Sequence, residues 1–167
     1  MSDQLKRSPK KALIDYLLSY LEVRHQTALR SSEIARASAA NKANVAENKY
    51  DTLGTEASYL VDGQAKRALA CLDDVNAVKH MRVINFTVDD AIALGTYIQL
   101  VDQDDRTLCL FLAPVSGGLK FHYNDTDIMI ITPQSPLGHC LLGKFVDDEF
   151  DFGEGAHKKH YVIQDIN

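Results

Sequence analysis

The sequence lacks any run of apolar residues long enough to cross a membrane, which takes about 18 or more consecutive residues. Residues 1–11 are polar and basic, and no apolar segment of the signal-peptide type follows them. We therefore expect no membrane span and a cytoplasmic protein. A length of 167 residues suffices for one ordinary domain, or for a small domain with an elongated extension.

Cysteine is scarce and odd in number, since the chain holds only Cys71, Cys109 and Cys140. Their wide spacing fits neither a disulfide framework nor a metal site. We expect small, buried, apolar side chains in a reducing compartment.

Positive charge is also in deficit, with 18 Lys and Arg against 23 Asp and Glu and a net charge of −5. Phosphate binding normally needs a basic surface, so this balance argues against broad nucleic-acid binding and against direct sequence-specific binding to DNA. Residues 1–82 carry most of the Lys and Arg, while 102–105 and 147–151 are acidic. An acidic chain can still bind a basic groove of another protein.

Proline and glycine are rare in the N-terminal half: no second proline occurs from Pro9 to Met81, and the only glycines there are Gly54 and Gly63. Strong helix formers dominate this stretch. The segment 40–48 contains three asparagines and few large apolar groups, which favours a turn. We predict helices over 8–41 and 48–81 that form an antiparallel hairpin with its tip near 42–48.

Apolar and small residues recur along both predicted helices at intervals of three and four, with a polar break at Arg24 and one irregular step at Gln64. Towards the predicted tip, the seam between the helices consists of small residues. These bury little apolar area, so the tip should be the least stable part of the hairpin. A helical-bundle dimer is the alternative for this half. The two series are Ile14, Leu17, Leu21, Ala28, Ala35 and Leu53, Ala57, Leu60, Gln64, Ala68, Cys71, Val75, Val78.

After Met81 the pattern changes to short β-branched and aromatic runs separated by Asp- and Gly-rich turns. Ser135 and Pro136 suit the start of a helix that Gly143 would end, with Leu137, Leu141 and Leu142 on its apolar face. We predict an α+β protein in which residues 1–82 form the coiled-coil hairpin and 83–167 form an antiparallel sheet wrapped on one short helix. The expected strands are 95–101, 107–113, 120–123, 128–132, 145–150 and 160–166.

Two stretches carry a family resemblance, namely ANVAENKYDTLGTEASYLVDGQAKR at 43–67 and ITPQSPLGHCLLGKFVDDEFDF at 131–152. Together with the order of helical hairpin and β domain, they resemble the GreA/GreB family of transcription elongation factors. The most specific part is Ser-Pro-x-Gly-x-x-Leu-x-Gly-Lys-x-x-x-Asp-Glu at 135–149. The resemblance implies an FKBP-like C-terminal domain that docks at the rim of the RNA polymerase secondary channel, with Gln134, Ser135 and Pro136 in contact with the polymerase.

The resemblance also implies that the coiled coil enters the channel and brings acidic tip residues to the catalytic Mg²⁺, near the 3′ end of the nascent RNA. There the factor stimulates the polymerase's own cleavage of backtracked RNA; it is not an enzyme by itself and holds no stable metal or cofactor of its own. The family tip reads Asp-x-x-Glu-Asn, and here Glu47 and Asn48 match while Asn44 replaces the Asp. Asp51 lies four residues after Glu47 and could share a helix face with it.

A neutral amide binds Mg²⁺ more weakly than a carboxylate does, so two readings of the tip stay open. One is a cleavage factor with Glu47 directed at Mg²⁺ and Asn44 or Asp51 assisting. The other is a channel regulator that inhibits or modulates the polymerase without cleavage. A third reading is a coiled-coil dimerisation module unrelated to transcription. Independently of function, Asn44 with Glu47 and Asn48 with Asp51 also fit capping boxes at a helix start.

Other candidates are weaker. His157 and His160 are three residues apart in a predicted hairpin, where such residues point to opposite faces, so we expect no metal pair. Lys42, Lys49 and basic neighbours along the hairpin are typical of a solvated face, although in a channel factor they could lie near RNA. Prolyl isomerase activity would follow from the fold alone, which does not license a function.

Overall fold

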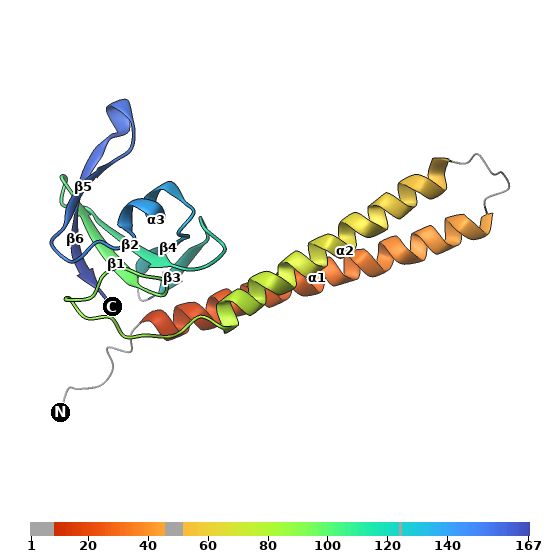
Figure 1. Cartoon of the computed structure of the whole chain (residues 1–167), viewed down its shortest axis with the longest axis horizontal. Coiled ribbons are helices and arrows are strands. Elements are labelled where there is room, and N and C mark those ends of the chain that lie inside the picture. The colour runs from red at the N-terminus through yellow and green to blue at the C-terminus, as the bar shows by residue number, and fades with distance from the viewer. Residues whose placement is uncertain (1–8, 46–51, 124) are drawn as a thin grey trace. The chain divides into compact units, whose positions relative to one another are not determined.

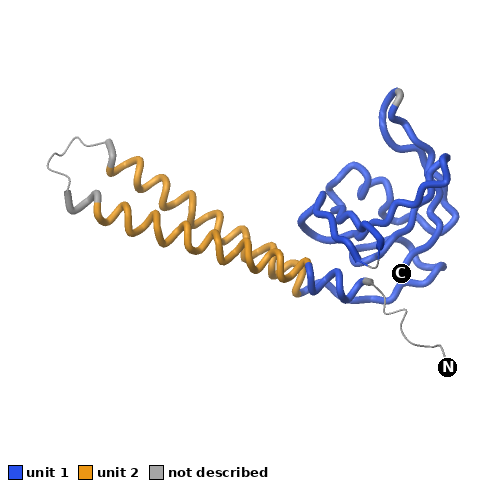
Figure 2. The backbone as a smooth tube through the Cα atoms, turned by 180° about the vertical axis from the view of Figure 1, so that it is seen from behind, with its two compact units in different colours: residues 1–16, 80–167 blue, residues 17–79 orange. Residues whose placement is uncertain are grey.

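The computed structural model describes residues 9–45, 52–123 and 125–167, and the chain divides into two compact units (Figure 2). One unit comprises residues 17–79, which form the helical hairpin. The other combines residues 80–167 with the start of the first helix, through Tyr16. The division expected at residue 82 differs in one respect, because the first two turns of the first helix pack with the C-terminal unit.

Two long helices, α1 over Pro9–Val45 and α2 over Thr52–Lys79, make up the N-terminal half (Figure 1). Helix α1 continues four residues beyond its expected end, and α2 begins four residues later than expected. Residues 42–45 are therefore helical, and the rest of the predicted tip falls within 46–51, outside the described residues. None of the described helices is both long and apolar enough to cross a membrane.

Contacts between the two helices establish an antiparallel register. Near the ends far from the turn, Lys79 Nζ lies 2.9 Å from Glu22 Oε1. Further along, Ala28 packs against Ala68 and Cys71 in a buried cluster. Residue numbers thus rise on α1 as they fall on α2, which confirms the predicted antiparallel hairpin.

The seam of α2 is more regular than the sequence pattern predicted. Leu60 was expected in the seam but is 55% exposed, whereas its neighbour Val61 is half-buried. Placing Val61 in the seam gives spacings of four and three without interruption, as in a heptad repeat. Hydrophobicity alone favoured the larger Leu60 as the seam residue. The rotation of α2 about its axis instead turns Val61 towards α1. The α2 seam is Ala57, Val61, Gln64, Ala68, Cys71, Val75 and Val78.

The C-terminal unit is a six-stranded sheet in the order β3-β4-β2-β1-β6-β5, with the short helix α3 over Pro136–Leu141. A 3-10 helix, η1, spans Gly155–His157. The α+β class with one short helix is confirmed. The strands are β1 Tyr97–Asp102, β2 Thr107–Leu112, β3 Lys120–Tyr123, β4 Thr126–Ile131, β5 Glu149–Phe152 and β6 Lys159–Ile166.

One strand pair departs from the expected antiparallel sheet, because β2 and β4 pair in parallel. After β2 the chain forms β3 not beside β2 but one strand position further out in the sheet. Strand β3 runs antiparallel to β4, which follows it in the chain. Strand β4 then fills the gap between β3 and β2, so it must run in the direction of β2. The remaining neighbours in the sheet pair antiparallel.

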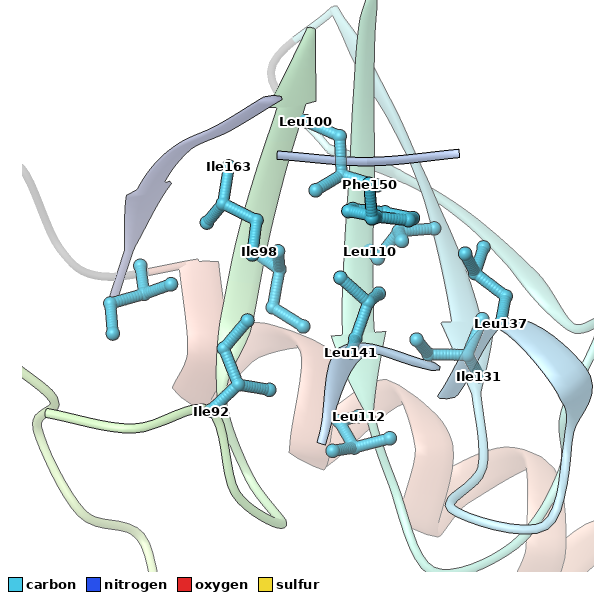
Figure 3. Close-up of a cluster of buried hydrophobic side chains, with 11 residues drawn as sticks. Ile92, Ile98, Leu100, Leu110, Leu112, Ile131, Leu137, Leu141, Phe150 and Ile163 are labelled. Atoms are coloured by element: carbon cyan, nitrogen blue, oxygen red, sulfur yellow. The ribbon is translucent and has the colours of Figure 1, made fainter. Parts of the chain in front are cut away.

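The core of this unit lies between the sheet and α3 (Figure 3). Leu141 of α3 is fully buried against a layer of strand side chains, and Leu137 packs beside Ile131 at the end of β4. Burying a side chain of this size contributes about 1.5–3 kcal/mol. The strand side chains of the cluster are Ile98, Leu100, Leu110, Leu112, Ile131, Phe150, Ile163 and Ile166.

Strand β5 begins at Glu149, so the prediction of a strand over 145–150 was wrong at its start. The preceding residues form a turn in which the Phe145 amide donates to Asp148 Oδ2 at 2.8 Å. Asp147 takes a positive φ of 68° there, which an extended strand does not allow. Local side-chain hydrogen bonds outweighed the β propensity of Phe145 and Val146.

The first turns of α1 are tied to the C-terminal unit by specific contacts. The Lys10 ammonium donates to the carbonyl of Ile84 and lies 4.9 Å from the ring centroid of Phe86. The ring of Tyr16 lies 4.6 Å from that of Phe121 on β3. These contacts explain why residues 9–16 group with the sheet. The cysteines are free, with Cys71 and Cys109 buried and Cys140 half-buried.

Candidate functional site

The loop between β4 and α3 holds the three residues predicted to contact a partner, Gln134, Ser135 and Pro136. Ser135 is the N-cap of α3, and its Oγ accepts a hydrogen bond from the Gly138 amide at 3.1 Å. The same hydroxyl donates to the Thr132 carbonyl at 2.7 Å. Pro136 occupies the first helical turn, where no backbone donor is needed. The predicted helix start is therefore confirmed.

Gly138 makes this tight turn possible. A Cβ at this position would lie 2.0 Å from the Thr132 carbonyl oxygen, closer than atoms can approach. Glycine lets the first turn of α3 pack directly on the end of β4. At the other end, Gly143 has a φ of 81° and stands just past the C-cap, as predicted for the residue that ends the helix.

Residues of this loop have two different roles, since one stabilises the loop itself and the others are exposed to solvent. The Ser135 hydroxyl is committed to the cap, whereas the side chains of Gln134 and Pro136 are exposed. Of the three predicted contact residues, the flanking two are thus available to a partner, and Ser135 holds the loop in shape.

Two exposed apolar side chains just beyond α3 were not identified from the sequence. Leu142 was predicted on the apolar face of the helix with Leu137 and Leu141, but it is about half exposed. The last turn of α3 ends at Leu141, and the chain then departs from the helical direction. Phe145, predicted in a strand, is likewise about half exposed. The pair of adjacent leucines was the only signal, because one helix face cannot bury both.

The predicted tip residues are only partly covered by the structure. Asn44 belongs to the last turn of α1, and its side chain falls outside what the structure describes. Glu47, Asn48 and Asp51 lie outside the described residues. Since Asn44 is inside α1, it cannot be the N-cap of α2, and the capping box predicted for Asn44 and Glu47 was wrong.

Among the described residues, several titratable groups with shifted pKa values gather on the strands β1, β5 and β6. Asp102 accepts hydrogen bonds from Lys159 and from the amides of Asp104 and Arg106, and these hold its pKa at about 2. His160 lies 2.9 Å from Asp151 and 3.3 Å from Glu149, and the bond to Asp151 does most to raise its pKa. These groups join strands rather than form a reactive site.

Metal binding has no support within the described part of the chain. No three His, Cys, Asp or Glu side chains gather there in a group that could hold an ion. His157 belongs to η1 and His160 to β6, where its ring contacts carboxylates on β5.

No protein-family model matches the chain. "Transcription elongation factor GreA" of Novosphingobium aromaticivorans is 30% identical over 107 residues, and the protein of the same name from Sphingopyxis alaskensis is 29% identical over 111 residues. Each match covers 62% of this chain, and the chain spans only 62% of the length of either relative.

Two solved structures of the transcription factor Gfh1 also align with the chain. One covers 90% of this chain and 92% of its own, with 16% identity and a TM-score of 0.40. The other, from Thermus thermophilus, covers 92% and 94%, with 16% identity and a TM-score of 0.37. Similarity to GreA thus appears in the sequence matches. The predicted resemblance of this chain to the GreA/GreB family of transcription elongation factors is confirmed.

Proposed function

We propose that this protein binds RNA polymerase at the secondary channel and stimulates the polymerase's own cleavage of backtracked RNA. The observation that supports this most is the hairpin, whose two helices pair along their length, and whose connecting residues 46–51, outside the described part of the chain, include Glu47 and Asp51 in the sequence. Sequence relatives named GreA support the same role. The protein would act in the cytoplasm and would not be an enzyme by itself.

Reach is the first requirement of this function. From Leu17 to Val45, α1 rises about 42 Å at 1.5 Å per residue. A rod of this length can carry a side chain into a narrow channel that a globular domain cannot enter. A seam of small residues keeps the rod thin, because Ala28, Ser32 and Ala35 let the helices approach closely.

Chemistry at the turn is the second requirement. Mg²⁺ takes oxygen ligands and is usually held by one or two carboxylates with waters and substrate phosphates. A carboxylate from Glu47 would help to hold a Mg²⁺ ion in the polymerase active site, where the ion lowers the pKa of a bound water for attack on the phosphodiester. Asp51 would provide a second carboxylate, and Asn44 would provide a neutral oxygen near the 3′ end of the RNA.

Docking is the third requirement, and the loop at 134–136 would provide it. Gln134 and Pro136 would contact the polymerase, while Ser135 keeps the loop in its conformation through the cap. Gln134→Ala with Pro136→Ala should therefore weaken binding to RNA polymerase without unfolding the domain, and Glu154→Ala, on an exposed turn far along the chain, is the matched control. Equal affinities for the loop variant and the control would remove the loop from the interface.

The decisive experiment measures RNA cleavage in a stalled, backtracked polymerase complex with and without the protein. We expect stimulation by the wild type and a loss of about 10- to 100-fold in Glu47→Ala, the range typical of groups that tune a metal site. Glu56→Ala, which removes the same charge from the exposed surface of α2, should change nothing. Asn44→Asp should increase the rate, because it adds a carboxylate.

A second function is favoured by Asn44 itself, the neutral residue at a position where the family has an acid. In that case the hairpin would enter the channel and modulate or inhibit the polymerase without cleavage. Absence of stimulation by the wild type, together with slowed RNA synthesis, would select this regulator. If Asn44→Asp then gained cleavage, the missing charge would be the cause.

A further inference from the structure

One face of the hairpin, which we call the leucine face, carries a groove between the helices. Leu29 of α1 and Leu69 and Leu72 of α2 line it, together with the small residues Ser32, Ala65 and Ala68. The groove also contains His25, Glu33 and Arg36 of α1. The groove measures about 280 Å³. These leucines are exposed, Leu69 to 62%, although the seam beneath them is buried. A two-helix rod cannot bury a second apolar stripe, so this one needs a partner.

The groove continues towards the turn of the hairpin. Arg36 and Ala65 line both this groove and a second one, which also contains Asp62 and Val61. At the opposite end, beyond the leucines, stands the ion pair of Glu22 and Lys79. The leucine face therefore carries three leucines, with His25 and Glu33 beside them, between opposite charges at both ends. At each end the acid and the base lie on different helices.

This arrangement is complementary to itself. If two hairpins pack face to face about a two-fold axis parallel to their helices, α1 of one copy lies over α2 of the other, antiparallel and at the same height. Arg36 of each copy then meets Asp62 of the other, and Glu22 meets Lys79. Asp62 also pairs with Lys66 of its own helix at 2.7 Å, so the contact with Arg36 would add a second base to that acid. The leucines of both copies meet in the middle. All four helices have antiparallel neighbours, as in an up-down four-helix bundle.

We propose that the leucine face pairs with the same face of a second copy of this chain, forming a homodimer through a four-helix bundle. The inference does not depend on polymerase binding. It has a consequence for any function of the hairpin inside a channel, since a bundle of four helices is twice as thick as the rod. Dimerisation would keep the hairpin out of such a channel, and dilution or a competing partner would return it to the monomer.

Sedimentation equilibrium of the full chain, from micromolar to millimolar concentration, tests the proposal. We expect a reversible monomer–dimer equilibrium. Leu69→Glu should weaken it by about tenfold or more, because it places a charge in the apolar centre of the interface. Leu60→Glu introduces the same charge on α2 at a side chain that is 55% exposed and does not line the groove, so it should leave the dimer unchanged. Helical content measured by circular dichroism controls for folding.

A charge exchange tests the orientation. Arg36→Glu alone brings two acids together twice per dimer and should weaken it. Arg36→Glu combined with Asp62→Arg should restore the wild-type affinity, because the pair is inverted. A monomer at every concentration would overturn the proposal, as would equal effects of Leu69→Glu and Leu60→Glu. A monomer whose Leu69→Glu variant loses binding to another protein would assign the face to that protein and equally overturn the dimer.

Discussion

At the scale of single residues, Gly138 is constrained by three atoms, namely the carbonyl oxygen and carbon of Thr132 and the Oγ of Ser135. We predict that Gly138→Ala destabilises the C-terminal unit by about 1–3 kcal/mol, the usual cost of overpacking, because the new methyl group would force α3 away from β4. Urea unfolding followed by tyrosine fluorescence measures this.

Gly63→Ala is the control for that substitution. Gly63 lies inside α2 with open space around it, so alanine there should instead stabilise the helix by about 0.5–1 kcal/mol. A neutral effect of Gly138→Ala would mean that the turn is looser than its geometry indicates.

Lys10 is the most unusual charged residue of the protein. It is 1% exposed, and burial lowers the pKa of its ammonium from 10.5 to about 8. Its contacts are a backbone carbonyl and the face of an aromatic ring, neither of which is an anion. The charged form is therefore poorly compensated, and folding shifts the protonation equilibrium of Lys10 towards the neutral form.

This burial predicts a pH dependence. Between about pH 8 and 10.5 the unfolded chain holds more protons on Lys10 than the folded one, so the free energy of unfolding should rise with pH in this window, by at most about 3 kcal/mol. Lys10→Met should be free of that contribution. Urea unfolding of both proteins at pH 7, 9 and 10.5 isolates the effect as a difference, since other groups titrate equally in both. Parallel curves for the two proteins would contradict it.

At the scale of elements, the hairpin seam contains one unsatisfied polar group. The Gln64 Oε1 is buried without a hydrogen-bond partner among the described residues. We predict that Gln64→Leu raises the stability of the hairpin by about 1 kcal/mol, because an unpaired buried acceptor is replaced by an apolar group.

Hydrogen exchange along α1 and α2 is the appropriate measurement for that change, since it reports each helix separately. Gln26→Leu, at an exposed position of α1, should leave exchange unchanged. Slower exchange in the control as well would point to general helix propensity rather than to the seam.

Sequence patterns predicted those elements whose signals are local. Ser135, Pro136 and Gly143 mark the ends of α3 by capping chemistry that depends on a few neighbouring residues, and the structure confirms all three. Strands β2, β3 and β6 were likewise placed within a residue at either end. Each combines β-branched or aromatic residues with turn residues on both sides.

Elements that depend on distant contacts were predicted less well. Choosing Val61 over Leu60 for the seam depends on helix rotation, which α1 determines. The parallel pairing of β2 with β4 depends on where β4 inserts in the sheet, which is between β3 and β2. The predicted start of β5 is instead a turn, which Asp148 stabilises by a hydrogen bond. No periodicity in the sequence reports these choices, because each is decided by packing after the local structure has formed.

At the scale of the whole molecule, the chain combines a domain that can dock with a hairpin that can reach. The loop predicted to dock is held by the N-cap of α3, and the hairpin is held by an antiparallel seam between α1 and α2. The two regions predicted to act on a partner thus belong to different sections of the chain, and the proposed function would require both to act on one polymerase molecule.

Photo-crosslinking tests this central claim most directly. Benzoylphenylalanine would be placed at position 134 in one variant and at position 44 in another, and each variant would be irradiated in complex with RNA polymerase. We predict that position 134 crosslinks to the polymerase surface around the entrance of the secondary channel, and that position 44 crosslinks to segments beside the catalytic Mg²⁺. Crosslinks from position 134 with none from position 44 inside the channel, or no crosslinks from either, would contradict the account.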